Sequence, residues 1–477
     1  MSGRILQARQ TDGRVIEFES TSLNQGGEKT VFMSRDRSHV VAFYHGQLKD
    51  RLERVDRLTR ILTRYNPTHG ERGAYWQPYF CWPTGMIDRD GVPADFAKSY
   101  GLAWPALAVV APVYRPNFFF RDRFGNRQEK EVKWFTGMKA AKLVPDPEKG
   151  NLLTRLQVCV RLARAVRRMH FAGLAHSDLS NKNVLIDPKA GDACVIDIDS
   201  LVVPGVAPPS VLGTPGYIAP EVLAGKAQPS IDTDKHALAV LIYQILLGRH
   251  PLQGKKVHSM HSAEHDEALA MGARALYVEH PLDRSNPPLA PIKVAAERLG
   301  PFLAPLFMRA FVNTLHHPTR RPHAAEWESA LYRTLQLVHP SPTNRDWTIL
   351  APGLPLDAPF TGERLSRPVP YARFLRDMDG TLADEKTGLV LWHNLVVHDW
   401  HLRSGVLPDE GADRTPMGYV SFHGGQWWLV NTSRRDLLVR NGGTVAHGAQ
   451  LELAPGLEVR TSDRDDARVW RIEFLRP

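Results

Sequence analysis

The order of apolar and polar positions divides the chain into a β-rich start, a helical middle and a β-rich end. Between residues 14 and 44, short apolar runs alternate with polar residues and turns, which predicts a small antiparallel sheet. Residues 47–65 carry apolar side chains at helical spacing opposite a charged face, which predicts an amphipathic helix. Strand-like segments at 79–86 and 107–113 complete this first part.

Helical periodicity dominates the middle of the chain, at residues 152–170, 234–247, 299–315 and 324–338. Residues 341–380 are then rich in proline and have little periodicity, as a linker would. Short alternating apolar runs with frequent glycines return from about residue 389, so we expect a small all-β domain over residues 381–477.

Composition narrows the function classes. The chain has 477 residues, a formal net charge of +9 and three isolated cysteines, so neither a disulfide framework nor a CxxC metal knuckle is expected. Because there is no apolar run of about 18 residues and no apolar stretch at the N-terminus, we expect a soluble, cytoplasmic protein without a membrane partner. The arginines are spread along the chain, which argues against nucleic acid as a partner.

The strongest chemical signal runs from His176 to Asn183 (HSDLSNKN), between a predicted helix and the apolar strand 184–186. Phosphoryl transfer needs a carboxylate to orient the attacking hydroxyl and a neutral oxygen ligand for Mg²⁺. Asp178 and Asn183 supply these groups, and Lys182 can add positive charge beside the transferring group. The segment matches the protein-kinase catalytic loop. The alternative is a polar loop that only connects the helix to the strand.

A second acidic segment follows the predicted strand 194–196. In the kinase pattern, an aspartate at this distance past the catalytic loop binds the metal that bridges the ATP phosphates. Asp197 is the better match, and Asp199 could share or replace it as the metal ligand. The alternative for both residues is a solvated acidic turn.

The segment from Gly213 to Glu221 (GTPGYIAPE) resembles the end of the activation segment of serine/threonine kinases. By that resemblance, Thr214 lies beside the catalytic aspartate and favours hydroxyl over phenol substrates. The resemblance also implies structural roles for three residues. Asp234 holds the backbone of the catalytic loop, which begins at His176, and Arg321 forms a buried bridge with Glu221.

The chain also departs from the kinase pattern. The strand that usually carries the phosphate-binding lysine reads VVAFY at residues 40–44 and contains no lysine. In the preceding glycine loop, the third glycine is replaced by Lys29, as in the with-no-lysine kinases. We therefore expect Lys29 to bind the ATP phosphates with Gly26, Gly27 and Val31, and Glu53 to be its carboxylate partner. Ser177 replaces a common arginine, so activity without phosphorylation of the activation loop is expected.

More narrowly, the segments 166–170, 173–180, 40–44 and 80–83 resemble a bacterial group of eukaryotic-like serine/threonine kinases. These kinases are encoded with a metal-dependent protein phosphatase and a von Willebrand A-domain protein, in the triad associated with tellurite resistance. The resemblance implies those two proteins as partners. Group members carry a cysteine-rich zinc ribbon after the kinase domain, but residues 339–362 contain no cysteine. Residues 341–380 are thus either a linker or a degenerate ribbon without its metal.

The end of the chain is similar to the tail of a forkhead-associated β-sandwich, in the segments 428–433 and 451–459 with Asn441, Gly442, Gly443 and Gly448. Such domains bind phosphothreonine through an arginine and a serine, and Arg403 and Ser433 are the candidates here. The alternative is a generic β-sandwich that docks a partner protein.

Together these features predict an α+β, bilobal protein-kinase-like fold with lobes at 1–112 and 113–340, followed by the small all-β sandwich. The expected function is transfer of the γ-phosphate of ATP to a serine or threonine of a partner protein, with Mg²⁺ or Mn²⁺. One alternative is a pseudokinase scaffold, which the intact Asp178, Asn183 and Asp197 disfavour. A second is a small-molecule kinase, which the segment 213–221 disfavours.

Overall fold

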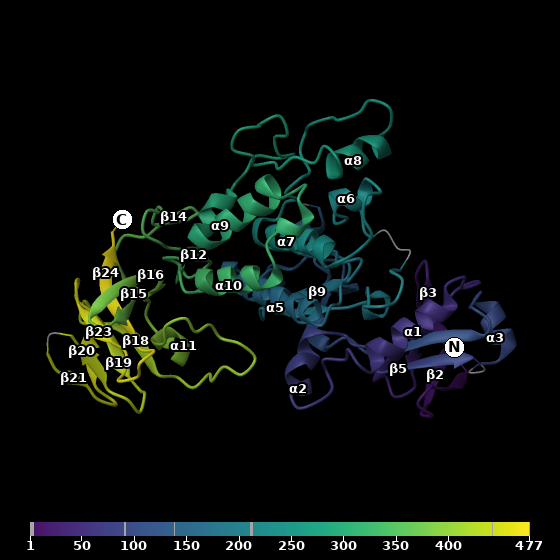
Figure 1. Cartoon of the computed structure of the whole chain (residues 1–477), viewed down its shortest axis with the longest axis horizontal. Helices are drawn as coiled ribbons and strands as arrows, with labels where there is room; N and C mark the ends of the chain where they lie inside the picture. Colours follow the sequence, from purple (N-terminus) through teal and green to yellow (C-terminus); the bar gives the residue numbers. More distant parts are fainter. Residues whose placement is uncertain (1–3, 90–91, 138, 210–212, 441, 477) are drawn as a thin grey trace. The chain divides into compact units, whose positions relative to one another are not determined.

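The computed structural model describes residues 4–89, 92–137, 139–209, 213–440 and 442–476 (Figure 1). Asn441 of the expected sandwich signature lies outside these residues. The chain forms two compact units, the first from residues 1–150, 161–287 and 310–324, and the second from residues 151–160, 288–309 and 325–477. Each unit therefore combines segments that are distant in the sequence. No helix within the described ranges is long and apolar enough to cross a membrane.

The first unit begins with a six-stranded antiparallel sheet in the order β1-β2-β3-β4-β6-β5. Three phenylalanines from neighbouring strands, Phe18, Phe32 and Phe43, are fully buried on one face and pack against Phe96 of helix α3 (Ala94–Ser99). This packing explains the alternating apolar pattern of the segment. The strands are β1 (Ile5–Arg9), β2 (Val15–Gln25), β3 (Lys29–Ser34), β4 (His39–Tyr44), β5 (Gly85–Arg89) and β6 (Ala106–Pro112).

Two local expectations differ from the structure. The strand expected at 79–86 is mostly not a strand, because residues 77–79 form a short 3₁₀ turn that contains Pro78 and strand β5 begins only at Gly85. Helix α1 (Arg51–Leu62) buries Leu58 and Ile61, but Leu52 is 83% exposed. The buried face of helix α1 is therefore narrower than the face that carries its apolar residues.

The helical part of the first unit is centred on α7 (Ile231–Leu247), which is buried along most of its length. Its first turn has a capping box between Ser230 and Thr233, and it ends at Gly248 in the left-handed conformation (φ 69°). Helix α5 (Leu152–Phe171), whose residues 152–160 belong to the second unit, leads through residues 172–183 to the hairpin β9–β10 (Val184–Asp187 and Asp192–Val195). The smaller elements are α2 (Gly73–Trp76), β7 (Phe119–Arg121), β8 (Arg127–Glu129), α4 (Lys133–Thr136), α6 (Pro220–Leu223) and α8 (Ala263–Met271).

The second unit contains a two-sheet β structure, in the orders β16-β15-β24-β23-β20-β21 and β17-β18-β19-β22. Its core includes the fully buried Phe374 and Trp470, which stack at 6.0 Å between ring centroids. Strand β15 (Val369–Met378) lies before residue 381, where we expect this domain to begin. The sequence does not indicate this strand, because Pro368 and Pro370 interrupt its alternation of apolar and polar residues. The other elements are β16 (Thr381–Val390), β17 (Val396–Val397), α11 (Asp399–Leu402), β18 (Gly418–His423), β19 (Gln426–Asn431), β20 (Leu437–Val439), β21 (Thr444–Val445), β22 (Gln450–Glu452), β23 (Glu458–Arg460) and β24 (Arg468–Leu475).

The proline-rich segment before this domain is structured. It forms two short hairpins, β11–β12 (Val338–Pro340 with Trp347–Ile349) and β13–β14 (Asp357–Ala358 with Glu363–Arg364). The Asp346 carboxylate accepts a hydrogen bond of 2.9 Å from the backbone nitrogen of Leu152 and so caps helix α5. The same unit contains helices α9 (Gly300–Met308) and α10 (Ala324–Leu335), the latter apart from its first residue.

Candidate active site

The loop from His176 to Asn183 is fixed by a buried network below it. His176 is fully buried, and its backbone nitrogen donates to the Asp234 carboxylate of helix α7 at 2.8 Å. Its ring Nε2 lies 2.8 Å from the carbonyl oxygen of Ile196. Because a carbonyl can only accept, the proton is on Nε2. Asp234 also lies 3.1 Å from Nε2 of His170 on α5, so one carboxylate ties the loop to two helices.

Within the loop, Asn183 and Asp178 are in direct contact. The Asn183 amide nitrogen donates to both the backbone oxygen (2.9 Å) and the carboxylate (3.0 Å) of Asp178. The backbone of Ser177 is left-handed (φ 60°), and its hydroxyl donates to the Ser200 carbonyl at 2.9 Å. Since the amide nitrogen of Asn183 is used by Asp178, the amide oxygen is the group available for a metal.

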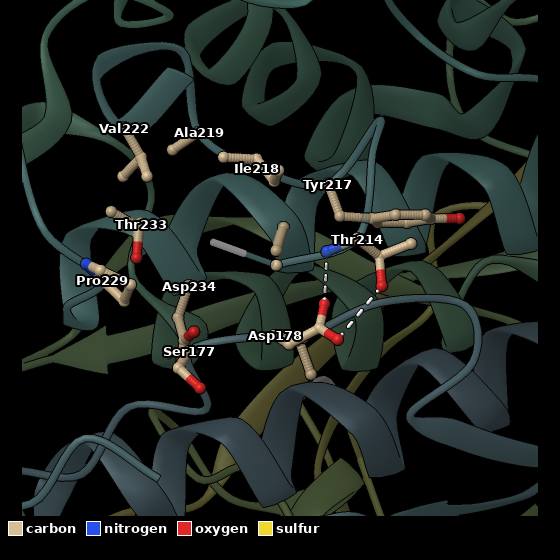
Figure 2. Close-up of a pocket in the computed structure, with 13 residues that line it drawn as sticks. Ser177, Asp178, Thr214, Tyr217, Ile218, Ala219, Val222, Pro229, Thr233 and Asp234 are labelled. Carbon is tan, nitrogen blue, oxygen red and sulfur yellow. Dashed lines mark hydrogen bonds between the residues drawn. The ribbon is translucent and has the colours of Figure 1, made fainter. Parts of the chain in front are cut away.

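Figure 2 shows the Asp178 carboxylate in direct contact with Thr214, and both residues line a small cavity. The Thr214 backbone nitrogen donates to one carboxylate oxygen at 2.7 Å, and its hydroxyl donates to the other at 3.1 Å. Gly213 has φ +98°, a conformation that favours glycine, and brings the backbone beside the carboxylate. Asp178 is thus held in one orientation by residues from both predicted motifs.

The far end of the 213–221 segment is anchored by Glu221. Arg321, only 1% exposed, donates to both Glu221 carboxylate oxygens at 2.8 and 2.7 Å. Its guanidinium also donates to the carbonyls of Asp232 (3.0 Å) and Leu315 (2.7 Å). This bidentate arrangement makes the ion pair directional as well as charged.

Lys29, at the start of strand β3, reaches two carboxylates that are far away in the sequence. Its ammonium lies 2.8 Å from Asp197 and 2.8 and 2.9 Å from the two carboxylate oxygens of Asp199. Burial alone would lower the pKa of Lys29, but the negative charges of Asp199 and Asp197 outweigh it and hold this pKa well above the usual value. Lys29 therefore stays charged at every physiological pH.

The two carboxylates differ in their surroundings. Asp199 has a side chain only 7% exposed, and the Tyr44 hydroxyl donates to it. Burial would raise the pKa of Asp199, but Lys29 and this hydroxyl hold it well below the usual value. Asp197 has a left-handed backbone (φ 58°) and a side chain 38% exposed. The accessible carboxylate is thus Asp197, and the anchored one is Asp199.

These groups fit a divalent cation. The carboxylates of Asp197 and Asp199 already bind one positive charge, the ammonium of Lys29. The backbone nitrogen of Ile196 donates to the Asn183 carbonyl at 3.0 Å, which brings the catalytic loop close to the segment that carries the two aspartates. Carboxylate and amide oxygens are the ligands that Mg²⁺ and Mn²⁺ prefer. No cluster of three or more His, Cys, Asp or Glu side chains suited to a metal occurs in the part of the chain that is described.

The other predicted residues differ in their surroundings. Glu53 lies on the exposed face of α1, and Lys29 pairs with the two aspartates instead. Lys182 is exposed at the loop surface. Gly26 and Gly27 form the exposed turn before Lys29, where the Gly26 nitrogen donates to the Lys29 carbonyl at 2.9 Å. Val31 is half-buried in β3.

In the second unit, the candidate phosphothreonine ligands are bound to neighbours. Arg403 pairs with Asp466 at 2.7 Å and with Asp399 at 3.1 Å. Ser433 is 3% exposed, and its hydroxyl lies 2.7 Å from both the side-chain oxygen of Asn431 and the carbonyl of Arg435, to one of which it donates. Both side chains therefore stabilise loops of their own domain in this structure.

Sequence reasoning missed two residues beside Lys29. Tyr44 ends the strand that lacks a lysine, and Arg54 of helix α1 lies over its ring, with 4.6 Å between the guanidinium carbon and the ring centroid. The sequence could have indicated Tyr44, because the strand at residues 40–44 that lacks a lysine still ends next to the phosphate-covering loop. Nothing in the periodicity of α1 distinguished Arg54 from the other arginines of that helix.

Comparison with known proteins agrees with this geometry. Residues 152–299 match the sequence model of the protein kinase domain family. A chicken (Gallus gallus) protein named "Dual serine/threonine and tyrosine protein kinase" is 33% identical over 163 residues, which are 34% of this chain and 14% of the relative. The human protein of that name is 33% identical over 114 residues, 24% of this chain and 11% of the relative. The Xenopus tropicalis protein of that name is 35% identical over 98 residues, 20% and 10% of the two chains.

The chain thus spans about one seventh or less of the length of these relatives. The family match at residues 152–299 includes neither the N-terminal sheet nor the C-terminal β domain. Inside the matched range lie Asp178, Asn183, Asp197 and the segment 213–221, which are the groups that the structure brings together. Residues 152–299 are therefore similar in sequence to a protein kinase domain.

Proposed function

We propose that this chain is an active serine/threonine kinase that transfers the γ-phosphate of ATP to a hydroxyl of a partner protein. The observation that carries this proposal is the orientation of Asp178, whose carboxylate is held by Thr214 and Asn183 and faces the cavity of Figure 2. A scaffold has no need of an oriented carboxylate at this point.

Each residue then has a role in the transfer. The substrate hydroxyl attacks the γ-phosphorus, the bond to the bridging oxygen of ADP breaks, and Asp178 accepts the hydroxyl proton. Asn183, Asp197 and Asp199 would hold Mg²⁺ or Mn²⁺, which neutralises phosphate charge when bound. Lys29 would bind the α- and β-phosphates, and the exposed Lys182 adds charge near the transferring group.

The experiment is transfer of labelled phosphate from ATP with Mg²⁺ to candidate proteins, by the wild-type chain and by Asp178→Ala. We expect the variant to lose at least roughly a hundredfold in rate while it still binds ATP, because only the positioned base is removed. Asp146→Asn is the matched control, since this exposed carboxylate pairs with Lys149 on the surface. Equal rates for wild type and Asp178→Ala would refute the role of Asp178.

A pseudokinase scaffold is the second candidate, favoured by one observation. The Lys29 ammonium is already bound by both carboxylates, so one positive charge partly neutralises this site without a metal. Such a scaffold would bind nucleotide without turnover. Binding of ATP by the wild-type chain with no transfer to any hydroxyl, its own included, would support this candidate.

We also propose a domain division, a bacterial origin, two partner proteins and a role for the C-terminal domain. We propose lobes at 1–112 and 113–340, a cytoplasmic bacterial protein of the tellurite-resistance type, and a von Willebrand A-domain protein and a metal-dependent phosphatase as partners. We propose docking as the role of the C-terminal β domain, expected at 381–477, whose sheet also includes strand β15 (Val369–Met378), and we propose a forkhead-associated-like fold for it. We propose that the two hairpins between residues 338 and 364 are a degenerate ribbon. Co-purification and phosphorylation of the A-domain protein, reversed by the phosphatase, would test the partners.

A further inference from the structure

Helix α1 is tied to the rest of the site in an unusual way. In protein kinases, an ion pair between a strand lysine and a helix glutamate must be in place for activity. Here the strand has no lysine, and Glu53 of the helix is exposed. We propose that Arg54 and Tyr44 replace that ion pair as positioning residues that tie helix α1 to Lys29 through Asp199. This inference rests on the proposed kinase activity.

Tyr44 forms the inner half of this connection. Its side chain is 1% exposed, and its hydroxyl donates to the Asp199 carboxylate. Asp199 in turn makes two of the hydrogen bonds that hold the Lys29 ammonium, at 2.8 and 2.9 Å. That ammonium also lies 5.6 Å from the centroid of the Tyr44 ring. Fixing the Asp199 carboxylate therefore fixes the position of the Lys29 charge.

Arg54 forms the outer half. Its guanidinium lies over the Tyr44 ring, 3.6 Å from the Glu28 carboxylate in the glycine loop and 3.2 Å from Asp50 before the helix. The side chain is 11% exposed, and its Nε has no hydrogen-bond partner in the described part of the chain. One arginine thus contacts strand β4, the glycine loop and its own helix. A shift of α1 away from the sheet would break the first two contacts together.

The consequence is a continuous chain of contacts from α1 to the phosphate-binding lysine. A cation over an aromatic face and a hydrogen bond to a carboxylate are both directional, so they transmit position as well as charge. The lysine is thereby preorganised before the nucleotide arrives, which is how binding groups are made effective.

Tyr44→Phe tests the inner half, since it removes the hydroxyl and keeps the ring. We expect the KM for ATP to rise about tenfold and kcat to fall, with the KM for the protein substrate unchanged, because a hydrogen bond to a charged group is lost at the nucleotide side. Tyr100→Phe is the matched control. Its hydroxyl donates to the Ser20 carbonyl at 2.9 Å, outside the site.

Arg54→Gln and Arg54→Lys test the outer half. Gln should reproduce the effect of Tyr44→Phe, whereas Lys keeps a cation for the ring and for Glu28 and should restore most of the activity. In the double variant Tyr44→Phe/Arg54→Gln, the rise in KM should be smaller than the product of the single effects, because both residues act through Asp199. A merely structural role would lower the thermal midpoint without this pattern.

The outcomes separate the two proposals. Two outcomes with an active wild type would show that the proposed connection is wrong. In the first, Tyr44→Phe and Arg54→Gln both have the same KM for ATP as Tyr100→Phe. In the second, the rise in KM in the double variant equals the product of the two single rises. If wild type transfers no phosphate, the kinase proposal fails. The ATP-induced rise in the thermal midpoint then tests the connection, which predicts a smaller rise in Tyr44→Phe and Arg54→Gln than in Tyr100→Phe. An equal rise in all three would overturn it.

Discussion

Arg321→Met should strongly destabilise the first compact unit. The replaced guanidinium is 1% exposed and makes hydrogen bonds to Glu221 and to the carbonyls of Asp232 and Leu315. The substitution leaves a largely buried carboxylate without its partner, and breaking a buried ion pair in this way costs about 3–5 kcal/mol. Since each kcal/mol shifts the thermal midpoint by roughly 2–4 °C in domains of 150–250 residues, we expect a fall of about 10 °C.

Thermal unfolding of wild type, Arg321→Met and the double variant Arg321→Met/Glu221→Leu is the assay. Replacing both partners by apolar side chains removes the unpaired charge, so the double variant should recover much of the lost midpoint. Phosphotransfer should also fall in the single variant, because Glu221 anchors the segment that carries Thr214 to Asp178. A midpoint within about 2 °C of wild type for Arg321→Met, less than one kcal/mol by the same conversion, would refute this reasoning.

Three further predictions concern metal, pH and the segment 338–364. Asp197→Asn should weaken Mg²⁺ binding more than Asp199→Asn does in a metal titration, because Asp197 is the accessible carboxylate; the reverse order would assign the metal to Asp199. Burial lowers the pKa of His250 from 6.5 to about 4, so the unfolded chain binds the proton more readily than the folded chain does. The stability of the fold should therefore fall as the pH drops from about 6.5 to 4. His250→Gln should reduce the slope of the thermal midpoint against pH, and an unchanged slope would exclude His250 as the cause. Asp346→Ala should cost about 1 kcal/mol through the lost cap of α5 and Asp346→Asn much less, and equal midpoints for the two would contradict the capping role.

The sequence predicted what is local. The helices at 152–170 and 234–247, the loop at 176–183 and the segment at 213–221 are each defined by residues within a few positions of one another, and the structure places them within a residue or a few of the expected bounds. The kinase domain itself is supported by the family match over residues 152–299. Such elements follow from periodicity and from motifs of fixed spacing.

The partners of Lys29 could not be predicted, because they depend on packing between distant segments. Asp197 and Asp199 lie 168 and 170 residues further along the chain. The same holds for Asp346, which caps Leu152 across 194 residues from a segment that was predicted to be a linker or a degenerate ribbon. Sequence spacing gave Glu53 as the partner of Lys29, but the rotation of α1 places Arg54 at the sheet instead.

The most direct test of the central claim compares phosphate transfer from ATP by wild type and by Lys29→Met. We expect measurable transfer by wild type and a loss of at least roughly 3 kcal/mol of transition-state stabilisation in the variant, on the order of a hundredfold in rate, because Lys29 supplies the main protein cation for the phosphates. Unchanged transfer by Lys29→Met, or ATP binding without any transfer by wild type, would contradict it.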